Sequence, residues 1–161
     1  MDRIENIQRW KVRQELKKVA EEEAKNEHLA QLTADIEALW DRAKVLIEVY
    51  NEGKKVGMPY PADTMHQRCF MSDSWSHHIG VGYYYPGMYH GNPGFGDANR
   101  TAMNAISIRG GGACNYEIDL CDGKLHYTGD AIARLERFVK DYNYFEKYFY
   151  DWIDEHTNSL A

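Results

Sequence analysis

The sequence predicts an α+β fold with a long N-terminal helix, an antiparallel sheet of about four strands, and a C-terminal amphipathic helix packed on one face of the sheet. Apolar residues recur at steps of three and four over residues 29–50 and again over residues 135–152, which places each set on one side of a helix. Residues 79–97 lie between these patterns and are rich in glycine and aromatic side chains. Terminal helices with apolar stripes need an apolar surface, and an antiparallel sheet can offer one face and leave the other wet.

The N-terminal helix is predicted from the absence of helix breakers. No proline or glycine occurs from Asp2 to Glu52, and most residues there favour helices, so we expect one long helix or two nearly collinear helices. Gly53 and Gly57 come next, and two prolines follow within four residues. Because glycine accepts positive φ at a helix C-terminus and proline cannot continue a helix, we expect the helix to stop there.

The apolar pattern changes within this helical region. The stripe that starts at Leu29 does not extend backwards, and residues 21–27 are polar on every side, which is typical of a solvated bridge, a kink or an arm. A separate short stripe lies upstream, formed by Val12, Leu16 and Val19. We therefore predict a charged helical arm over residues 1–27 and a single α+β domain over residues 28–161.

The strands are predicted from the alternation of residue types. In residues 77–85, Ile79 and Val81 fall on one face and two glycines on the other, which leaves a shelf for a bend or for close approach by a backbone or ligand. Asp122 and Gly123 tolerate the positive φ pair of a tight turn, so we expect a hairpin there. The strand segments are 66–71, 77–85, 103–109, 114–121 and 124–127.

The composition favours an acidic, reduced protein. The 161 residues include 25 acidic and 19 basic side chains, and a formal net charge of -6 argues against binding nucleic acid mainly by phosphate neutralisation. The three cysteines form an odd set, and no apolar run approaches the about 18 residues of a spanning helix. We expect a soluble cytoplasmic protein with no membrane contact and no direct sequence-specific DNA binding.

Metal binding is the first chemistry to consider, because five of the seven histidines fall in the central segment. His66 and Cys69 have a spacing that a metal accepts, but a structural zinc site needs a second close pair. That pair would be His77 and His78, whose side chains point to opposite faces of a strand. We therefore expect no metal and no cofactor, and we interpret these histidines as polar strand residues.

Thiol chemistry is the second possibility. A cysteine could act with a histidine as base and with Asp97 or Asp119 as the orienting carboxylate. No local signature surrounds the cysteines, and cysteine is among the most buried residue types, so we interpret them as small core side chains. We do not expect an enzyme, but a metal-dependent or thiol hydrolase built on His66, His78, His126 and a cysteine stays open as an alternative. It requires those groups to converge in one cleft.

A small-ligand binder or nucleotide sponge is another alternative. Gly110 to Gly112 lie beside Arg109 and could present consecutive backbone N–H groups to a phosphate. Neither the Walker pattern nor the dinucleotide fingerprint is present, and the glycines join two strands, so we prefer to interpret them as a flexible hairpin loop. In the alternative, aromatic side chains stack on a base while Arg100, Arg109 or the triple glycine holds the phosphate.

The segment from Pro86 to Arg100 is longer than ordinary connections, whose median is about five residues. Its aromatic side chains and turn-forming residues argue against disorder. Because tyrosine and tryptophan dominate binding hot spots, we expect an outward-facing contact surface here, extended by Tyr60 and Trp75. The alternative is that the strand tyrosines fill the core. The predicted partner-binding residues are Trp10, Tyr84, Tyr85, Met88, Tyr89, His90, Phe95, Arg100 and Arg109.

The charged N-terminal region also allows two interpretations. A basic cluster over residues 9–18 precedes an acidic run at residues 21–23, which is typical of a solvated helix with ion pairs three and four residues apart. The alternative is an arm that pairs with its own copy or lies on a partner, burying Ile4, Ile7, Trp10, Val12 and Leu16. Residues 29–50 could serve both a sheet and a second subunit, so we expect a homodimer formed through helices.

Small size, acidic balance, a charged helical arm and a compact sheet with a tyrosine-rich loop together resemble the small inhibitor proteins of phages and mobile elements, including anti-CRISPR proteins. This resemblance is one of general style over the whole chain and transfers no functional residue. It implies a non-enzymatic binding protein that occludes a macromolecular partner, such as a host CRISPR nuclease or another defence system. We expect that partner to be a protein or ribonucleoprotein.

Overall fold

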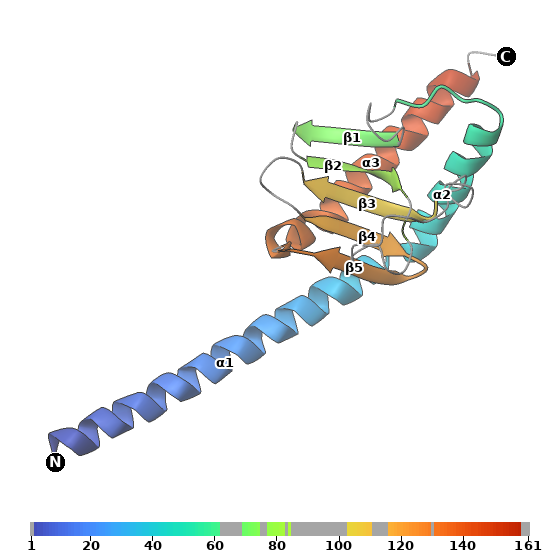
Figure 1. Ribbon diagram of the computed structural model, residues 1–161. Helices are drawn as coiled ribbons and strands as arrows, with labels where there is room; N and C mark the ends of the chain where they lie inside the picture. Colours follow the sequence, from blue (N-terminus) through green and yellow to red (C-terminus); the bar gives the residue numbers. More distant parts are fainter. Residues whose placement is uncertain are drawn as a thin grey trace, which may run out of the picture. The chain divides into compact units, whose positions relative to one another are not determined.

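The computed structural model describes residues 2–61, 69–74, 77–82, 84, 103–110, 116–129 and 131–158 (Figure 1). Within these residues three helices and five strands follow one another in the order α1, α2, β1 to β5 and α3. The chain divides into two compact units, Met1–Ala34 and Asp35–Ala161, which are described separately. The predicted α+β class, with a long N-terminal helix and a C-terminal helix on an antiparallel sheet, is confirmed.

Helix α1 (Arg3–Glu37) makes up residues 3–34 of the first unit, and its last three residues belong to the second. Its start is capped by Asp2, whose Oδ1 accepts a hydrogen bond from the N–H of Ile4 at 3.1 Å. The polar segment 21–27 is continuous helix, and every side chain from residue 2 to residue 28 is exposed. The first unit is thus a charged helix that buries none of these side chains.

The helical region contains two helices, and the break falls at Ala38 and Leu39. Leu39 stays near helical φ and ψ and precedes α2 (Trp40–Lys55). Gly57 adopts a φ of +83° and its N–H donates to the carbonyl of Lys54, so the predicted glycine stop is confirmed at this position.

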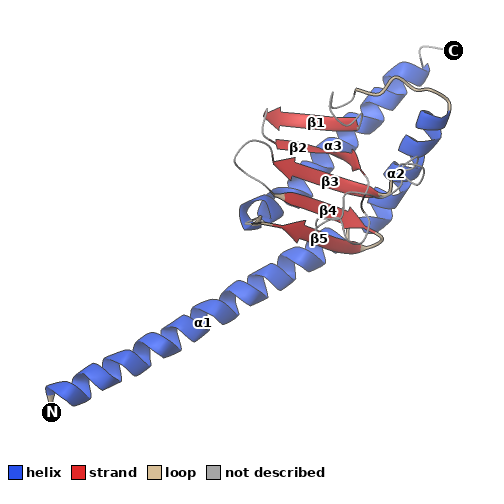
Figure 2. Cartoon of the chain, viewed as in Figure 1, coloured by secondary structure: helices blue, strands red, loops and turns tan. Residues whose placement is uncertain are grey.

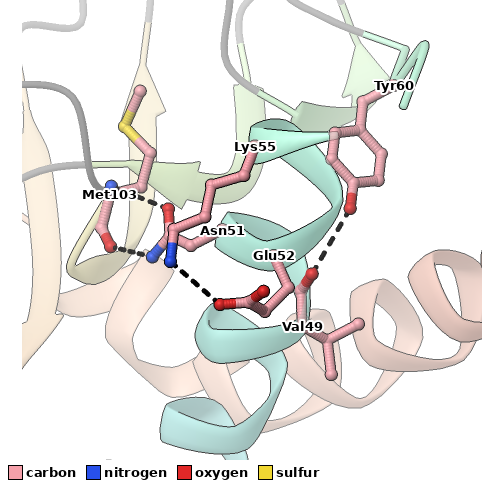
Figure 3. A network of polar contacts seen from close by, with 6 residues as sticks. All are labelled: Val49, Asn51, Glu52, Lys55, Tyr60 and Met103. Atoms are coloured by element: carbon pink, nitrogen blue, oxygen red, sulfur yellow. Dashed lines mark hydrogen bonds and ion pairs between the residues drawn. The ribbon is translucent and has the colours of Figure 1, made fainter. Parts of the chain in front are cut away.

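Gly53, in contrast, lies inside α2, and the prediction that it helps to stop the helix is wrong. Its role is to make room, because a Cβ built there would lie 1.8 Å from the hydroxyl oxygen of Tyr60. The chain after the helix folds back and places the Tyr60 ring on this bare stretch of backbone. The Tyr60 hydroxyl donates to the carbonyl of Val49 at 3.4 Å (Figure 3).

The sheet has five strands in the sequential order β1-β2-β3-β4-β5, and every neighbouring pair is antiparallel (Figure 2). The strands are β1 (Cys69–Ser74), β2 (His77–Gly82), β3 (Ala105–Gly110), β4 (Glu117–Cys121) and β5 (Lys124–Thr128). Asp122 and Gly123 join the last two with φ values of 54° and 78°, which confirms the predicted hairpin.

One face of the sheet forms the core of the second unit. The register aligns Ile79, Ile108 and Ile118 across three strands, and Val81, Ile106 and Leu120 form the next row. All six side chains are buried. Helix α3 (Ile132–Asn158) crosses behind the sheet in Figure 1 and buries its own stripe, formed by Leu135, Phe138, Tyr142, Phe145 and Phe149.

Helices α2 and α3 are joined directly. Arg42 of α2 donates to Asn143 and pairs with Glu146 of α3, both at 2.8 Å. The Tyr60 ring stacks on Tyr50 with centroids 4.7 Å apart, and lies 5.2 Å from the ring of Trp152. Tyr60 therefore packs within an aromatic cluster between the two helices.

Asn51 links α2 by hydrogen bonds to the segment just before β3. Its side-chain Nδ2 donates to the carbonyl of Met103 at 2.7 Å, and its Oδ1 accepts from the N–H of Met103 at 3.0 Å (Figure 3). One amide side chain thus satisfies both backbone groups of a buried residue. None of the helices over the described residues is long and apolar enough to cross a bilayer.

Candidate interaction surfaces

The second face of the sheet carries a row of polar side chains. Because side chains alternate along a strand, the residues between the core isoleucines and leucines point to this face. The register places Gly80, Ser107, Asp119 and His126 side by side on β2, β3, β4 and β5. A hydroxyl, a carboxyl and an imidazole group, from Ser107, Asp119 and His126, therefore lie on neighbouring strands.

Ser107 and Asp119 form a buried pair in this row. The Ser107 hydroxyl donates to Oδ1 of Asp119 at 2.5 Å, and both residues have no exposed surface. Buried polar side chains are normally hydrogen-bonded in folded proteins, and this pair follows that rule. The pair joins β3 to β4 through side chains in addition to the backbone ladder.

Tyr84 and His126 form a second pair on the same face. Their rings stack with centroids 4.2 Å apart and 16° between the planes, and the Tyr84 hydroxyl lies 3.2 Å from Nδ1 of His126. Asn104 holds Tyr84 in place by accepting from its N–H at 2.7 Å and donating to its carbonyl at 2.8 Å. Burial lowers the pKa of His126, and the nearby Lys124 lowers it further, against a smaller opposite effect of Glu37.

Arg109 and Glu117 occupy the next row. Their side chains form an ion pair in which Nη2 of Arg109 lies 2.6 Å from Oε1 of Glu117. His78 of β2 is aligned with Arg109 in the same row. A small open depression next to this pair is lined by Arg109, Gly110, Tyr116, Glu117 and Thr128. A phosphate at this position would have to compete with Glu117 for the guanidinium.

The polar face does not have the arrangement of a serine triad. A serine triad places histidine between serine and carboxylate, whereas here the strand that carries Asp119 separates Ser107 from His126. Burial raises the pKa of the Cys121 thiol to about 11, so this cysteine is protonated at neutral pH. Among the described residues, no group of three or more His, Cys, Asp or Glu side chains could hold a metal ion.

Helix α1 presents the second candidate surface. Six of its apolar side chains, all within the exposed stretch of residues 2–28, have exposed fractions of 53% to 65%. At about 100° per residue they form two groups whose centres lie about 150° apart around the helix. We call Ile4, Ile7 and Trp10 the tip face. We call Val12, Leu16 and Val19 the middle stripe.

The predicted partner-binding residues fall into three places. Trp10 lies on the tip face of α1, with 58% of its surface exposed. Tyr84 and Arg109 lie on the polar face of the sheet, where each is partly buried and engaged with a neighbour. Six others lie outside the described residues: Tyr85, Met88, Tyr89, His90, Phe95 and Arg100.

Sequence reasoning missed the pairing of Ser107 with Asp119. The signal was present, because Ser107 stands between two isoleucines and therefore points away from the core face. What was missing was the register, since only a known alignment of β3 with β4 shows that Asp119 is the residue opposite. The sequence offers Asp119 as an orienting carboxylate for a cysteine, whereas in the structure the hydroxyl of Ser107 donates to it.

Comparisons with known proteins found no relative: no family model matches the chain, and neither the curated proteins nor the solved structures contain a match.

Proposed function

We propose that this protein is a non-enzymatic binding protein that binds a macromolecular partner through helix α1. The observation that carries the proposal is the exposure of Ile4, Ile7 and Trp10 on one side of α1, within residues 2–28, where every side chain is exposed. Scattered apolar side chains are ordinary on protein surfaces, but an isoleucine, an isoleucine and a tryptophan at steps of three form one contact patch. Tryptophan is also the residue type most enriched in binding hot spots.

The charged side chains near the tip face indicate the chemistry expected of the partner. Residues 2–20 contain six basic side chains (Arg3, Arg9, Lys11, Arg13, Lys17, Lys18) and three acidic ones (Asp2, Glu5, Glu15). An amphipathic helix of this kind binds in an apolar groove, and complementary charge guides it there. We therefore expect a protein partner whose groove has an apolar floor and acidic borders.

Occlusion is the proposed mode of action, because a helix seated in a groove denies that groove to other ligands. In its most specific form the protein is a phage-borne inhibitor that acts in the host cytoplasm on a CRISPR nuclease or another defence complex. The aromatic segment from Pro86 to Arg100, which lies outside the described residues, would then add contacts to those of α1.

The test is capture followed by measurement. The full-length chain is used to capture partners from a host lysate, the captured protein is purified, and its affinity for the wild-type chain is measured by calorimetry. Trp10→Ala should weaken binding at least about tenfold, because hot-spot truncations cost about 2 kcal/mol or more. Tyr144→Ala is the matched control, since Tyr144 is an aromatic residue of α3 with 69% of its surface exposed.

Two outcomes would contradict the proposal. Equal affinity of the wild-type chain and the Trp10→Ala and Ile7→Ala variants would remove the tip face from the interface. Binding of the chain to anionic vesicles or to nucleic acid with the same dependence on Trp10, and to no protein, would replace the proposed partner class. Loss of the partner's own activity on saturation with this protein would support occlusion.

A further inference from the structure

We propose that two copies of this chain pair through helix α1, in antiparallel orientation, along the middle stripe. The interface would consist of Val12, Leu16 and Val19 with one charged residue at each end, Arg9 and Glu23. It lies on a different side of the helix from the tip face, so it does not depend on the proposed function.

The stripe has the spacing of a helix–helix seam. Arg9, Val12, Leu16, Val19 and Glu23 follow one another at steps of three, four, three and four. Side chains at this spacing lie on one side of a helix and pack between those of a facing helix. All five residues are exposed in the first unit, and the three apolar ones have 53%, 64% and 53% of their surface accessible.

The charges at the ends decide the orientation. Arg9 lies seven residues before Leu16 and Glu23 seven residues after it, so each is about 10.5 Å from the centre along the axis. In an antiparallel pair centred on Leu16, each Arg9 faces the Glu23 of the second copy, and Val12 faces Val19. A parallel pair would place arginine against arginine and glutamate against glutamate. The stripe is therefore complementary to itself in one orientation only.

The rest of the helix carries the same polarity. Residues 2–20 contain six basic and three acidic side chains, whereas residues 21–37 contain one basic and six acidic ones. Antiparallel overlap of two copies brings the basic half of one helix toward the acidic half of the other. A two-fold symmetric interface of this type uses the same patch on both copies, as closed dimers do.

Three glutamates oppose this arrangement. Glu5 and Glu27 lie eleven residues before and after Leu16, so antiparallel overlap places each opposite the other in the second copy. The third is Glu15. It borders the stripe next to Leu16, and near the two-fold axis it would approach Glu15 of the second copy. Removing that charge with Glu15→Gln should tighten the dimer. In a parallel pair the two copies of Glu23 would repel instead, and Glu23→Gln would be the variant that strengthens association.

Sedimentation equilibrium of the full-length chain over a range of concentrations tests the pairing. The wild-type protein should follow a monomer–dimer equilibrium, and Leu16→Glu should abolish the dimer. Ile7→Glu is the matched control, because it places the same charge on the tip face of the same helix. Circular dichroism of each variant checks that the helix and the folded unit are retained.

Charge reversal then tests the register. Arg9→Glu alone and Glu23→Arg alone should each weaken the dimer about tenfold, because each replaces two attractive contacts by repulsive ones. The double variant should regain wild-type affinity, and a mixture of the two single variants should form a heterodimer. Lys11→Glu and Glu21→Arg, on other sides of the helix, are the controls.

Three results would overturn the proposal. A wild-type protein that stays monomeric at every accessible concentration would remove the dimer. A dimer that withstands Leu16→Glu would place the interface elsewhere. A double charge reversal that fails to restore association would reject the antiparallel register. None of these results bears on partner capture through Trp10, which is measured separately.

Discussion

Helices α1 and α3 carry similar apolar residues at similar steps, yet they use them in opposite ways. In α3, Leu135, Phe138, Tyr142, Phe145 and Phe149 have at most 1% of their surface exposed, whereas the six large apolar side chains of α1 between Ile4 and Val19 are more than half exposed. The difference lies in continuity. The stripe of α3 keeps to one side of the helix over about four turns, while the apolar residues of α1 split into two short groups on different sides. The unbroken stripe is buried within the protein's own fold, whereas the two short groups stay exposed.

The largest effect that this comparison predicts is the loss of a ring from α3. Phe145→Ala removes a fully buried side chain from the apolar stripe of α3 and should cost about 3–5 kcal/mol in the free energy of unfolding. Ile7→Ala on α1 should change it by less than about 0.5 kcal/mol, because that side chain lies in solvent. Urea unfolding followed by near-ultraviolet circular dichroism measures both. A large loss for Ile7→Ala would show that α1 is covered by its own chain.

The same contrast explains what the sequence could predict. The buried stripe of α3, the hairpin at Asp122 and Gly123 and the glycine end of α2 depend on local residue chemistry, so they could be predicted without coordinates. The position of Gly53 inside α2 could not be, because it depends on Tyr60, which returns to that helix from seven residues further along the chain.

The two candidate surfaces also differ in how far the sequence predicts them. The two exposed apolar groups of α1 can be located from the spacing of their residues, because each group is short and charged residues lie between and around them. On the sheet, alternation predicts which residues share the polar face, but the partners of Ser107 and His126 depend on register and on long-range packing. The sequence predicts Tyr60 as part of the contact surface, whereas the structure packs its ring against Tyr50 and Trp152, in a cluster that no local sequence pattern reveals.

A second prediction compares two side chains on the same helix, α2. Asn51→Ala removes the amide that serves both backbone groups of buried Met103 and should destabilise the protein by about 1–3 kcal/mol. Lys55→Ala breaks an ion pair with Glu52 in which both side chains are more than 70% exposed, and should have almost no effect. Parallel urea titrations of the two variants test this, and equal losses would contradict it.

A third prediction concerns pH and the polar face of the sheet. The pKa of His126 lies below its ordinary value of 6.5, so the unfolded chain takes up a proton at this residue more readily than the folded chain. This residue therefore stabilises the fold fully above pH 6.5, and its contribution is lost as the pH falls through that value towards the lower folded pKa. The urea midpoint should drop between pH 7.5 and pH 5.5, and the drop should be smaller in His126→Gln. Tyr84→Phe keeps the stacked ring and most of the burial, so it should keep most of the pH dependence.

The smallest effect is expected from removing residues 1–27 and retaining the end of α1. Every described side chain in that segment is exposed, so its removal should change the free energy of unfolding of the remaining domain by less than about 0.5 kcal/mol. The measurement belongs at low protein concentration, because any self-pairing through the middle stripe would add stability that rises with concentration. At high concentration the wild-type chain should then become more stable than the truncated one, while Leu16→Glu should not. A loss above about 1 kcal/mol at low concentration would mean that the domain uses the arm for its own stability, and α1 would join α3 as a helix committed to its own fold.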